Sequence, residues 1–409
     1  MSIKLKHFSK NRYNKTTILL LVLLLSLFSI LAPLETYGAT EKFYTLTEEL
    51  NSTVVDELNE IDFSGFNDVI NEFNKNKTNI FSIENVKSKV YSIISGDSAV
   101  NYNNFFANLF SSLIETIAKY LPMISLIVAI GVVSNLLNGV KSKFNEKSVG
   151  NLINLVCFLS VAILIIGIVS NLTESTGKSI DNMVSQMNII FPILITLMIA
   201  IGANASASAY RPIIAIISTY VADFFNYFIV PLFMLSFIFG FISNLSDNIK
   251  LDKFSAFISS LFKWGVGITF TLFFAIFSLQ GIAVGSFDSL SIRTTKYTIK
   301  SYVPVMGGYL SDGMDLILSS TLLIKNAVGL VGVLVIISTI LSPLIEIVVF
   351  SLMLKLVSAV LQPLGNNKTS NFLSNTSKSI IMLSSSLIAV GFMYLISVGL
   401  IMTTSNVVV

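Results

Sequence analysis

After residue 120 the chain is a succession of apolar runs, each long enough to cross the roughly 30 Å of hydrocarbon in a bilayer, separated by short polar stretches. Inside a bilayer every backbone polar group must be bonded within the protein, so such runs fold as helices. The sequence therefore predicts an all-α, polytopic helical membrane protein with a transmembrane domain at 120–409 and about eight transmembrane helices. The expected crossings are 121–139, 152–170, 188–204, 212–242, 257–285, 326–342, 344–363 and 380–402.

The composition excludes several classes of protein. Of the 409 residues 53% are apolar and 12% are charged, about half the charged fraction of soluble domains, which argues against a water-soluble enzyme. With one cysteine, Cys157, and one histidine, His7, the chain has no intramolecular disulfide and lacks the ligands and bases of zinc sites and hydrolase triads. The basic residues are too dispersed for a nucleic-acid surface. We expect a non-enzymatic chain without a cofactor, whose surroundings are membrane lipid.

The N-terminal section has the pattern of a secretory signal peptide at 1–38, in which a basic segment precedes an uncharged apolar run and small residues. A retained signal anchor is the alternative. Either way residues 39–119 lie outside the cytoplasm, and their apolar residues recur at helical spacing. We expect a small helical extracytoplasmic region that packs on itself, on the membrane or on a partner.

The charges of the loops predict the orientation, because Lys and Arg are retained on the cytoplasmic side. Eight crossings leave both mature termini outside and assign ten bases to the cytoplasmic loops, including those at 141–147 and 293–300. The run at 212–242 is long and contains Pro231, so whether it crosses once or twice is open; a single crossing gives the better charge asymmetry. The stretch at 301–324 is too polar for a comfortable crossing and too apolar for a free loop, which predicts an interfacial or re-entrant helix.

Ionisable residues at membrane depth are costly, so each is a candidate functional residue. Asp223 lies near the middle of its segment, and Asn226 falls on the same helical face three residues later. Glu346 and Lys355 are nine residues apart on another segment, about 13 Å along a helix, and are not expected to pair. The alternative for all of them is an interhelical polar contact that holds the bundle together.

Small residues cluster at 202–209 and at Gly281 and Gly285. They permit close approach of helices within the chain or between copies, so a homo-oligomer is left open.

Several strings resemble the stage III sporulation protein AE family of endospore-forming bacteria, over roughly residues 120–400. They are FPILITLMIAIGA (191–203), FISNLSD (241–247), SLQGIA (278–283), RTTKYTIKSYVPVMGGYLSDGMD (293–315), LLIKNAVGLVG (322–332) and LQPL (361–364). The resemblance implies a multi-pass membrane subunit, in the mother-cell membrane around the forespore, of a trans-envelope channel complex that joins mother cell and forespore and supports late forespore gene expression and forespore integrity. Its implied partners are the other subunits of that complex.

The densest match is proposed as a contact or gating segment, with basic residues followed by acidic ones. These residues are Arg293, Lys296, Lys300, Asp312 and Asp315. A stand-alone permease of a small solute is the second hypothesis, favoured by the polar groups at Asp223, Asn226, Glu346 and Lys355.

Overall fold

The computed structural model describes residues 48–74, 85–96, 102–141, 147–245, 251–302 and 307–404. The predicted signal peptide at 1–38 and the loop at 142–146 lie outside these described residues. The chain divides into two units, 1–52 and 53–409, and the second contains all of the described helices apart from the first turn of α2 (Glu48–Glu60). In the described ranges every regular element is helical, which confirms the prediction of an all-α protein.

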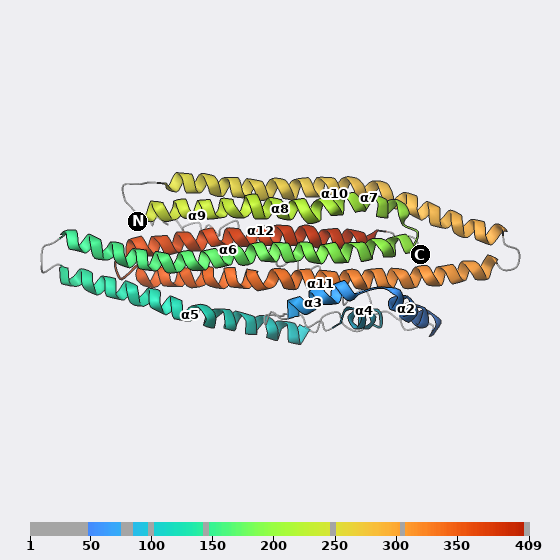
Figure 1. Cartoon of the computed structure of the whole chain (residues 1–409), viewed down its shortest axis with the longest axis horizontal. Coiled ribbons are helices and arrows are strands. Elements are labelled where there is room, and N and C mark those ends of the chain that lie inside the picture. Colours follow the sequence, from blue (N-terminus) through green and yellow to red (C-terminus); the bar gives the residue numbers. More distant parts are fainter. Residues whose placement is uncertain are drawn as a thin grey trace, which may run out of the picture. The chain divides into compact units, whose positions relative to one another are not determined.

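Six long helical segments form an antiparallel bundle. They are α5 (Tyr102–Lys141), α6 (Lys147–Ala200), the run α7 (Asn204–Ile216), η2 (Ile217–Val221), α8 (Ala222–Phe224), η3 (Phe225–Ile229) and α9 (Val230–Leu245), then α10 (Asp252–Tyr302), α11 (Gly307–Leu361) and α12 (Asn367–Thr403). Each of the six is long and apolar enough to cross a membrane, which agrees with a polytopic membrane protein. Figure 1 shows three layers: α10 with α7–α9, α12 with α6, and α11 with α5.

The structure has six such segments in the described ranges where eight crossings were expected. The stretches 152–170 and 188–204 are not separate helices: most of both lies in α6, and the polar residues between them are helical. The stretches 326–342 and 344–363 likewise share α11, which continues through Pro343. Proline is tolerated inside such helices because neighbouring groups satisfy the freed carbonyl. The run at 212–242 is one continuous segment.

The expected interfacial helix at 301–324 is not a separate element. Residues 301 and 302 end α10, residues 303–306 lie outside the described ranges, and 307–324 form the first turns of α11. These turns extend past the C-terminal end of α12, because the Lys325 side chain already lies at the last turn of α12, where its Nζ donates to the Thr404 carbonyl at 2.7 Å. This part of α11 packs on α10 and on the N-terminal helices.

Two serine pairs join the central helices α11 and α12. Ser351 and Ser377 exchange side-chain-to-carbonyl hydrogen bonds of 3.0 and 2.9 Å between α11 and α12, and Ser358 and Ser370 do the same at 2.8 Å each. Such reciprocal bonds hold the two backbones close together. At the other end of the bundle Gly202, with φ 82°, turns the chain from α6 into α7.

Three short helices precede the bundle: α2, α3 (Ser64–Asn74) and α4 (Val86–Ile94). Their apolar faces are buried, as the helical spacing at 39–119 predicts, with Val54, Phe66 and Val86 at most 1% exposed. Asp62 caps α3 by accepting from the Ser64 backbone N–H at 2.9 Å, and hydrogen bonds from the side chain and backbone of Ser64 lower the pKa of Asp62. Residues 102–119, the last part of the expected extracytoplasmic region, belong to the long helix α5, so no break separates them from the bundle.

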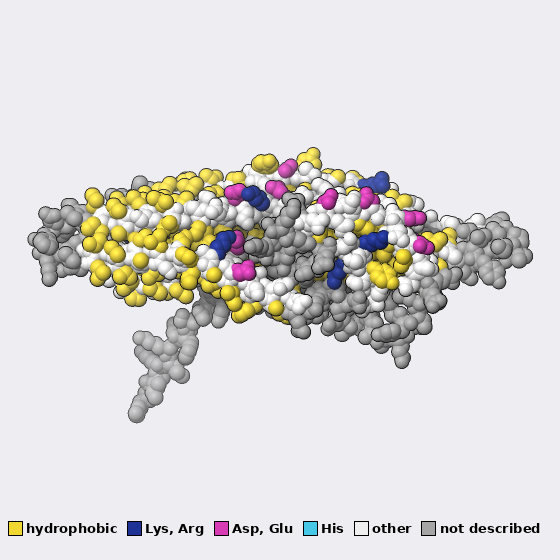
Figure 2. All heavy atoms as spheres, turned by 60° about the horizontal axis from the view of Figure 1, so that its bottom comes forward, with side chains coloured by type: hydrophobic (Ala, Val, Ile, Leu, Met, Phe, Trp, Pro, Cys, Tyr) yellow, Lys and Arg dark blue, Asp and Glu magenta, His cyan; other side chains and the backbone are white. Residues whose placement is uncertain are grey.

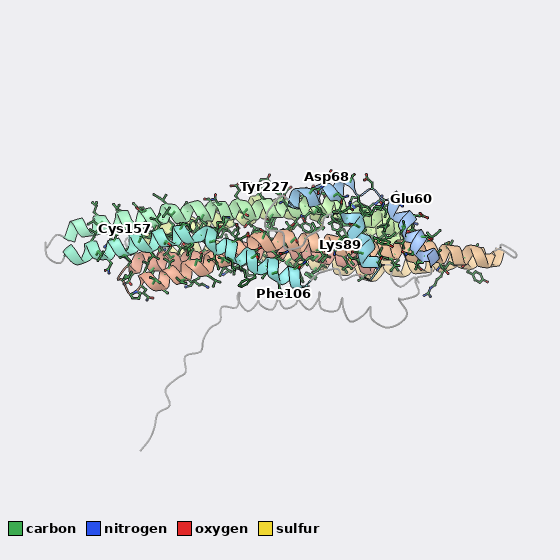
Figure 3. The ribbon with its side chains drawn as sticks, turned by 90° about the horizontal axis from the view of Figure 1, so that it is seen from below. Glu60, Asp68, Lys89, Phe106, Cys157 and Tyr227 are labelled. Carbon is green, nitrogen blue, oxygen red and sulfur yellow. The ribbon has the colours of Figure 1, made fainter. Side chains whose placement is uncertain are left out.

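The N-terminal helices pack on one half of the bundle. The Glu57 carboxylate accepts hydrogen bonds from Ser320 and Thr321 of α11 at 2.7 and 3.0 Å, and α3 lies against α6. In Figure 3, Asp68, Lys89 and Glu60 lie over this half, whereas Cys157 lies toward the other end. We call the half that carries α2–α4 the distal half.

Candidate functional site along the bundle axis

The other half of the bundle, where α5, α9 and α11 end and α6, α10 and α12 begin, exposes mainly apolar side chains. Large apolar residues with exposed fractions of 40% or more occur here on five of the six segments: Leu136 and Val133 on α5, Leu152 and Ile163 on α6, Leu235 and Ile238 on α9, Phe254, Phe257 and Trp264 on α10, and Leu352 and Leu356 on α11. Figure 2 shows hydrophobic side chains gathered over its left half and charged ones over the middle and right. We call this the apolar half, and its surface is that of a protein in contact with lipid.

The outer face of α6 shows where the apolar half ends. Ile163 is 69% exposed, but from Asn171 onward the exposed positions are mostly polar or charged, among them Glu174, Lys178 and Asn188. Most of the large apolar residues of 188–200 point into the protein instead, where Ile190, Leu194 and Met198 are fully buried, although Ile199 is 38% exposed. The second apolar stretch of α6 is therefore apolar because it is protein core.

Ion pairs lie at the level where the surface changes. Lys119 of α5 pairs with Glu346 of α11 at 2.5 Å, and the same ammonium lies 5.4 Å from the centre of the Tyr120 ring. On α6, Glu174 pairs with Lys178 at 2.6 Å. The predicted residue Glu346 thus binds a lysine that the sequence did not single out, and Lys355 is exposed about 13 Å away along α11. Charged pairs at this level suit a boundary between lipid and water.

Asp223 and Asn226 lie on the segment with the two π-helical stretches, η2 and η3. Asn226 donates from its side chain to the Asp181 carboxylate of α6 at 2.6 Å, whereas Asp223 is exposed on the outer surface of α8. Asn226 therefore makes the interhelical polar contact that the sequence analysis gave as the alternative for these residues. Tyr227, next to Asn226, is 81% exposed and lies about halfway along the bundle in Figure 3.

The proposed contact or gating segment lies at the far end of the distal half. Lys296 of α10 forms an ion pair with Asp315 of α11, and Arg293 is exposed. The side chains of Lys300 and Asp312 lie outside the described residues, although both positions are helical. The structure therefore brings two of the five predicted residues together, across the α10–α11 hairpin.

Asp288 is a buried carboxylate that the sequence reasoning missed. It lies on α10, is 2% exposed, and accepts hydrogen bonds from the backbone N–H groups of Ala205 and Ser206 at 2.9 and 3.0 Å. These N–H groups belong to the first turn of α7, so the carboxylate of Asp288 on α10 caps the positive, N-terminal end of α7. The small residues at 202–209 allow that close approach.

Lys325 is the second buried charge that was missed. It is fully buried on α11, and its ammonium donates to the Thr404 carbonyl at the C-terminal end of α12. The hydroxyl of Thr404 lies 3.1 Å from that of Tyr210 on α7. A cation at the negative, C-terminal end of a helix is favourable, so Lys325 stabilises the end of α12. Asp288 stabilises the positive, N-terminal end of α7 in the same way. The sequence around Asp288 and Lys325 gave no sign of these contacts, because the hydrogen-bond partner of each residue lies about 80 positions away along the chain.

Comparison with known proteins decides the family. A family model described as stage III sporulation protein AE matches residues 84–405, which include α4 and all six segments of the bundle. The chain belongs to the stage III sporulation protein AE family. A curated relative, the stage III sporulation protein AE of Bacillus subtilis (strain 168), is 24% identical over 323 residues, covering 79% of this chain and 81% of the relative. No solved structure matches the chain.

Membership in the stage III sporulation protein AE family implies a role in sporulation, and it confirms the resemblance seen in the sequence. The match includes both halves of the bundle and begins after α2 and α3. The candidate residues of this family member therefore all lie in the matched region, with the exception of Glu57.

Proposed function

We propose that this chain is a non-enzymatic integral membrane subunit of the trans-envelope, secretion-like channel complex that links mother cell and forespore, where it supports late forespore gene expression and forespore integrity. The observation that supports this role is the distal half. The part of α6 beyond Asn171 continues for about 45 Å with a polar outer face, at 1.5 Å per residue. A membrane subunit with such an extension can reach partners in the space between two membranes.

The proposed location is the mother-cell membrane around the forespore, with the distal half and α2–α4 on the extracytoplasmic side. Six crossings then leave the bases of 141–147 and Lys368 at the cytoplasmic tips of the apolar half. Arg293 and Lys296 move to the outside, contrary to the eight-crossing expectation. The retention of Lys and Arg applies within about 15–20 residues of a crossing, and Arg293 and Lys296 lie 17 and 20 residues after Ile276, the last residue of the apolar span of α10, at the edge of that window.

Labelling of single cysteines tests this orientation. In a Cys157→Ala background, Gln362→Cys lies at the end of α11 and Thr295→Cys is exposed on distal α10. We expect a membrane-impermeant maleimide to label Thr295→Cys in intact protoplasts of non-sporulating cells that express the chain in their outer cell membrane, and Gln362→Cys only after permeabilisation. Eight crossings place both positions in the cytoplasm, so protection of both in protoplasts would contradict the six-crossing arrangement.

The ion pair at the tip of the distal half provides a test of the function. We expect Asp315→Ala to reduce both spore yield and co-purification with other envelope proteins, while membrane insertion is retained. The exchanged pair Lys296→Asp with Asp315→Lys restores the attraction and should recover part of both. Asp252→Ala, at the exposed start of α10, serves as the matched control. A normal spore yield from cells that lack the whole chain would refute the role.

The permease hypothesis gains no support from the placement of its candidate residues. Asp223 and Lys355 are exposed on outer faces, and Glu346 pairs with Lys119. A transport site requires polar groups that converge on one substrate. Solute uptake by the purified protein in vesicles, abolished by Asp223→Asn, is the result that would favour it.

A further inference from the structure

The first turns of α12 expose polar side chains at the level of the apolar half. Asn371, Asn375 and Lys378 are exposed and follow one another at spacings of four and three residues, so they form one stripe along the helix. The level of the stripe is fixed by the serine pairs, since Ser370 contacts Ser358 and Ser377 contacts Ser351 of α11.

Side chains of α11 at that same level face lipid. Leu352 is 58% exposed, Leu356 62% and Val360 42%. The stripe on α12 thus lies beside leucines typical of a lipid contact. The apolar part of α12, 380–402, lies in the distal half and is mostly buried in protein. The exposed polar side chains of α12 therefore lie at the level where its neighbour α11 exposes apolar ones.

Two further lysines lie on the sides of α10 and α11 that border α12. Ser351 and Ser358 of α11 both contact α12. Lys355 lies four residues after the first and three before the second, so it falls on the same side of α11, and its side chain is exposed. Lys263 is also exposed and precedes by two turns Phe270, whose ring lies 6.0 Å from that of Phe392 on α12. We call Lys263, Lys355, Asn371, Asn375 and Lys378 the α12 face.

The α12 face carries positive charge without a nearby acid in the sequence of its helices. Residues 254–276, 347–361 and 367–382 contain no Asp or Glu. Charged and amide groups at membrane depth are costly unless another polar group meets them. Two copies of this chain meeting through the same face would bring lysines against lysines, which disfavours a symmetric dimer here. Exposed apolar side chains of α11, among them Leu352 and Leu356, lie beside the stripe.

We propose that the α12 face docks, within the bilayer, a transmembrane helix of a different protein that carries carboxylate side chains. The lysines supply charge complementarity, the asparagines form interhelical hydrogen bonds, and the flanking leucines pack against the apolar side of the incoming helix. This deepens the proposed function by naming the kind of subunit that the chain binds, and it rests on that function only for the identity of the complex.

Synthetic helices test the docking with the purified full chain in nanodiscs of zwitterionic lipid. The probe is a Leu/Ala transmembrane peptide of about 21 residues with two Glu seven positions apart near its centre, and its partner probe has Gln in their place. We expect the Glu peptide to bind about tenfold more tightly than the Gln peptide, measured by energy transfer between labels on peptide and protein. Lys355→Gln with Lys378→Gln should reduce that ratio to about one, while Lys253→Gln, at the first turn of α10, leaves it unchanged.

A second arm covers the case in which the double variant does not fold. Lys378→Glu alone should reverse the preference toward a peptide that carries Lys. Equal binding of the Glu and Gln peptides to the unaltered chain overturns the proposal. So does a Glu preference that persists in a folded double variant, and so does a preference that vanishes in anionic lipid, because lipid phosphates then satisfy these lysines. Since no spores are involved, a failure here is distinct from a failure of the sporulation role.

Discussion

A tryptophan at position 163 is expected to be quenched by brominated lipid, whereas a tryptophan at position 196 of the same helix is expected to be quenched by acrylamide in water. Both positions lie on the outer face of α6, Ile163 in the apolar half and Thr196 in the distal half. An expected crossing at 188–204 centres on Thr196 and would place it in the middle of the bilayer. The structure places it instead farther along α6, past exposed polar residues such as Lys178 and Asn188.

The measurement is well suited to this chain because Trp264 is its single tryptophan. In a Trp264→Phe background, Ile163→Trp and Thr196→Trp each report one site, and the unaltered Trp264 serves as the positive control. Trp264 is 70% exposed on α10 in the apolar half, so brominated lipid should quench it. Lipid quenching of equal strength at 163 and 196 would mean that both stretches of α6 lie in the membrane.

Asp288→Ala is expected to lower the free energy of unfolding by about 3 kcal/mol, the scale of two hydrogen bonds to a charged group. The substitution leaves the N–H groups of Ala205 and Ser206 without their acceptor in a buried place and removes negative charge from the positive end of α7. Asp288→Asn retains one acceptor oxygen and should cost about half as much.

Denaturant unfolding in detergent micelles, followed by circular dichroism, gives the comparison. The matched control is Asp223→Ala, which removes an exposed carboxylate from α8 and should change the unfolding free energy by at most about 0.5 kcal/mol. If both alanine variants unfold at the same denaturant concentration, the carboxylate of Asp288 does not stabilise the start of α7.

The sequence was sufficient to predict that the protein is helical, that it is a membrane protein, and which family it resembles. It was insufficient for the number of long helical segments, because an apolar run has the same composition whether lipid or protein surrounds it. The stretch 326–342 illustrates this: Val328, Val331 and Ile336 are fully buried among other helices of the chain. The polar stretch at 171–187 has the composition of a loop between two crossings, yet Thr176, Ile180 and Met183 within it are fully buried along α6.

The candidate residues were predicted with mixed success for a related reason. Hydropathy identifies a charge inside an apolar run, as at Glu346 and Lys355, but it cannot find the partner on another helix. Lys119 lies 227 positions before Glu346, and Asp288 lies 82 positions after Ser206. Asp288 and Lys325 also fall between the expected crossings, where a charge carries no cost, so nothing distinguished them from solvated residues.

In the proposed arrangement the helices α6 and α11 pass the level of the Lys119–Glu346 pair without interruption, so the membrane holds each of them at one end and the other end projects as a stiff rod. A membrane of different thickness makes such helices tilt. With about 45 Å of rod beyond the lipid, a tilt of about 10° displaces its far end by about 8 Å. A small change in the thickness of the surrounding lipid is thereby converted into a large sideways movement at the outer tip.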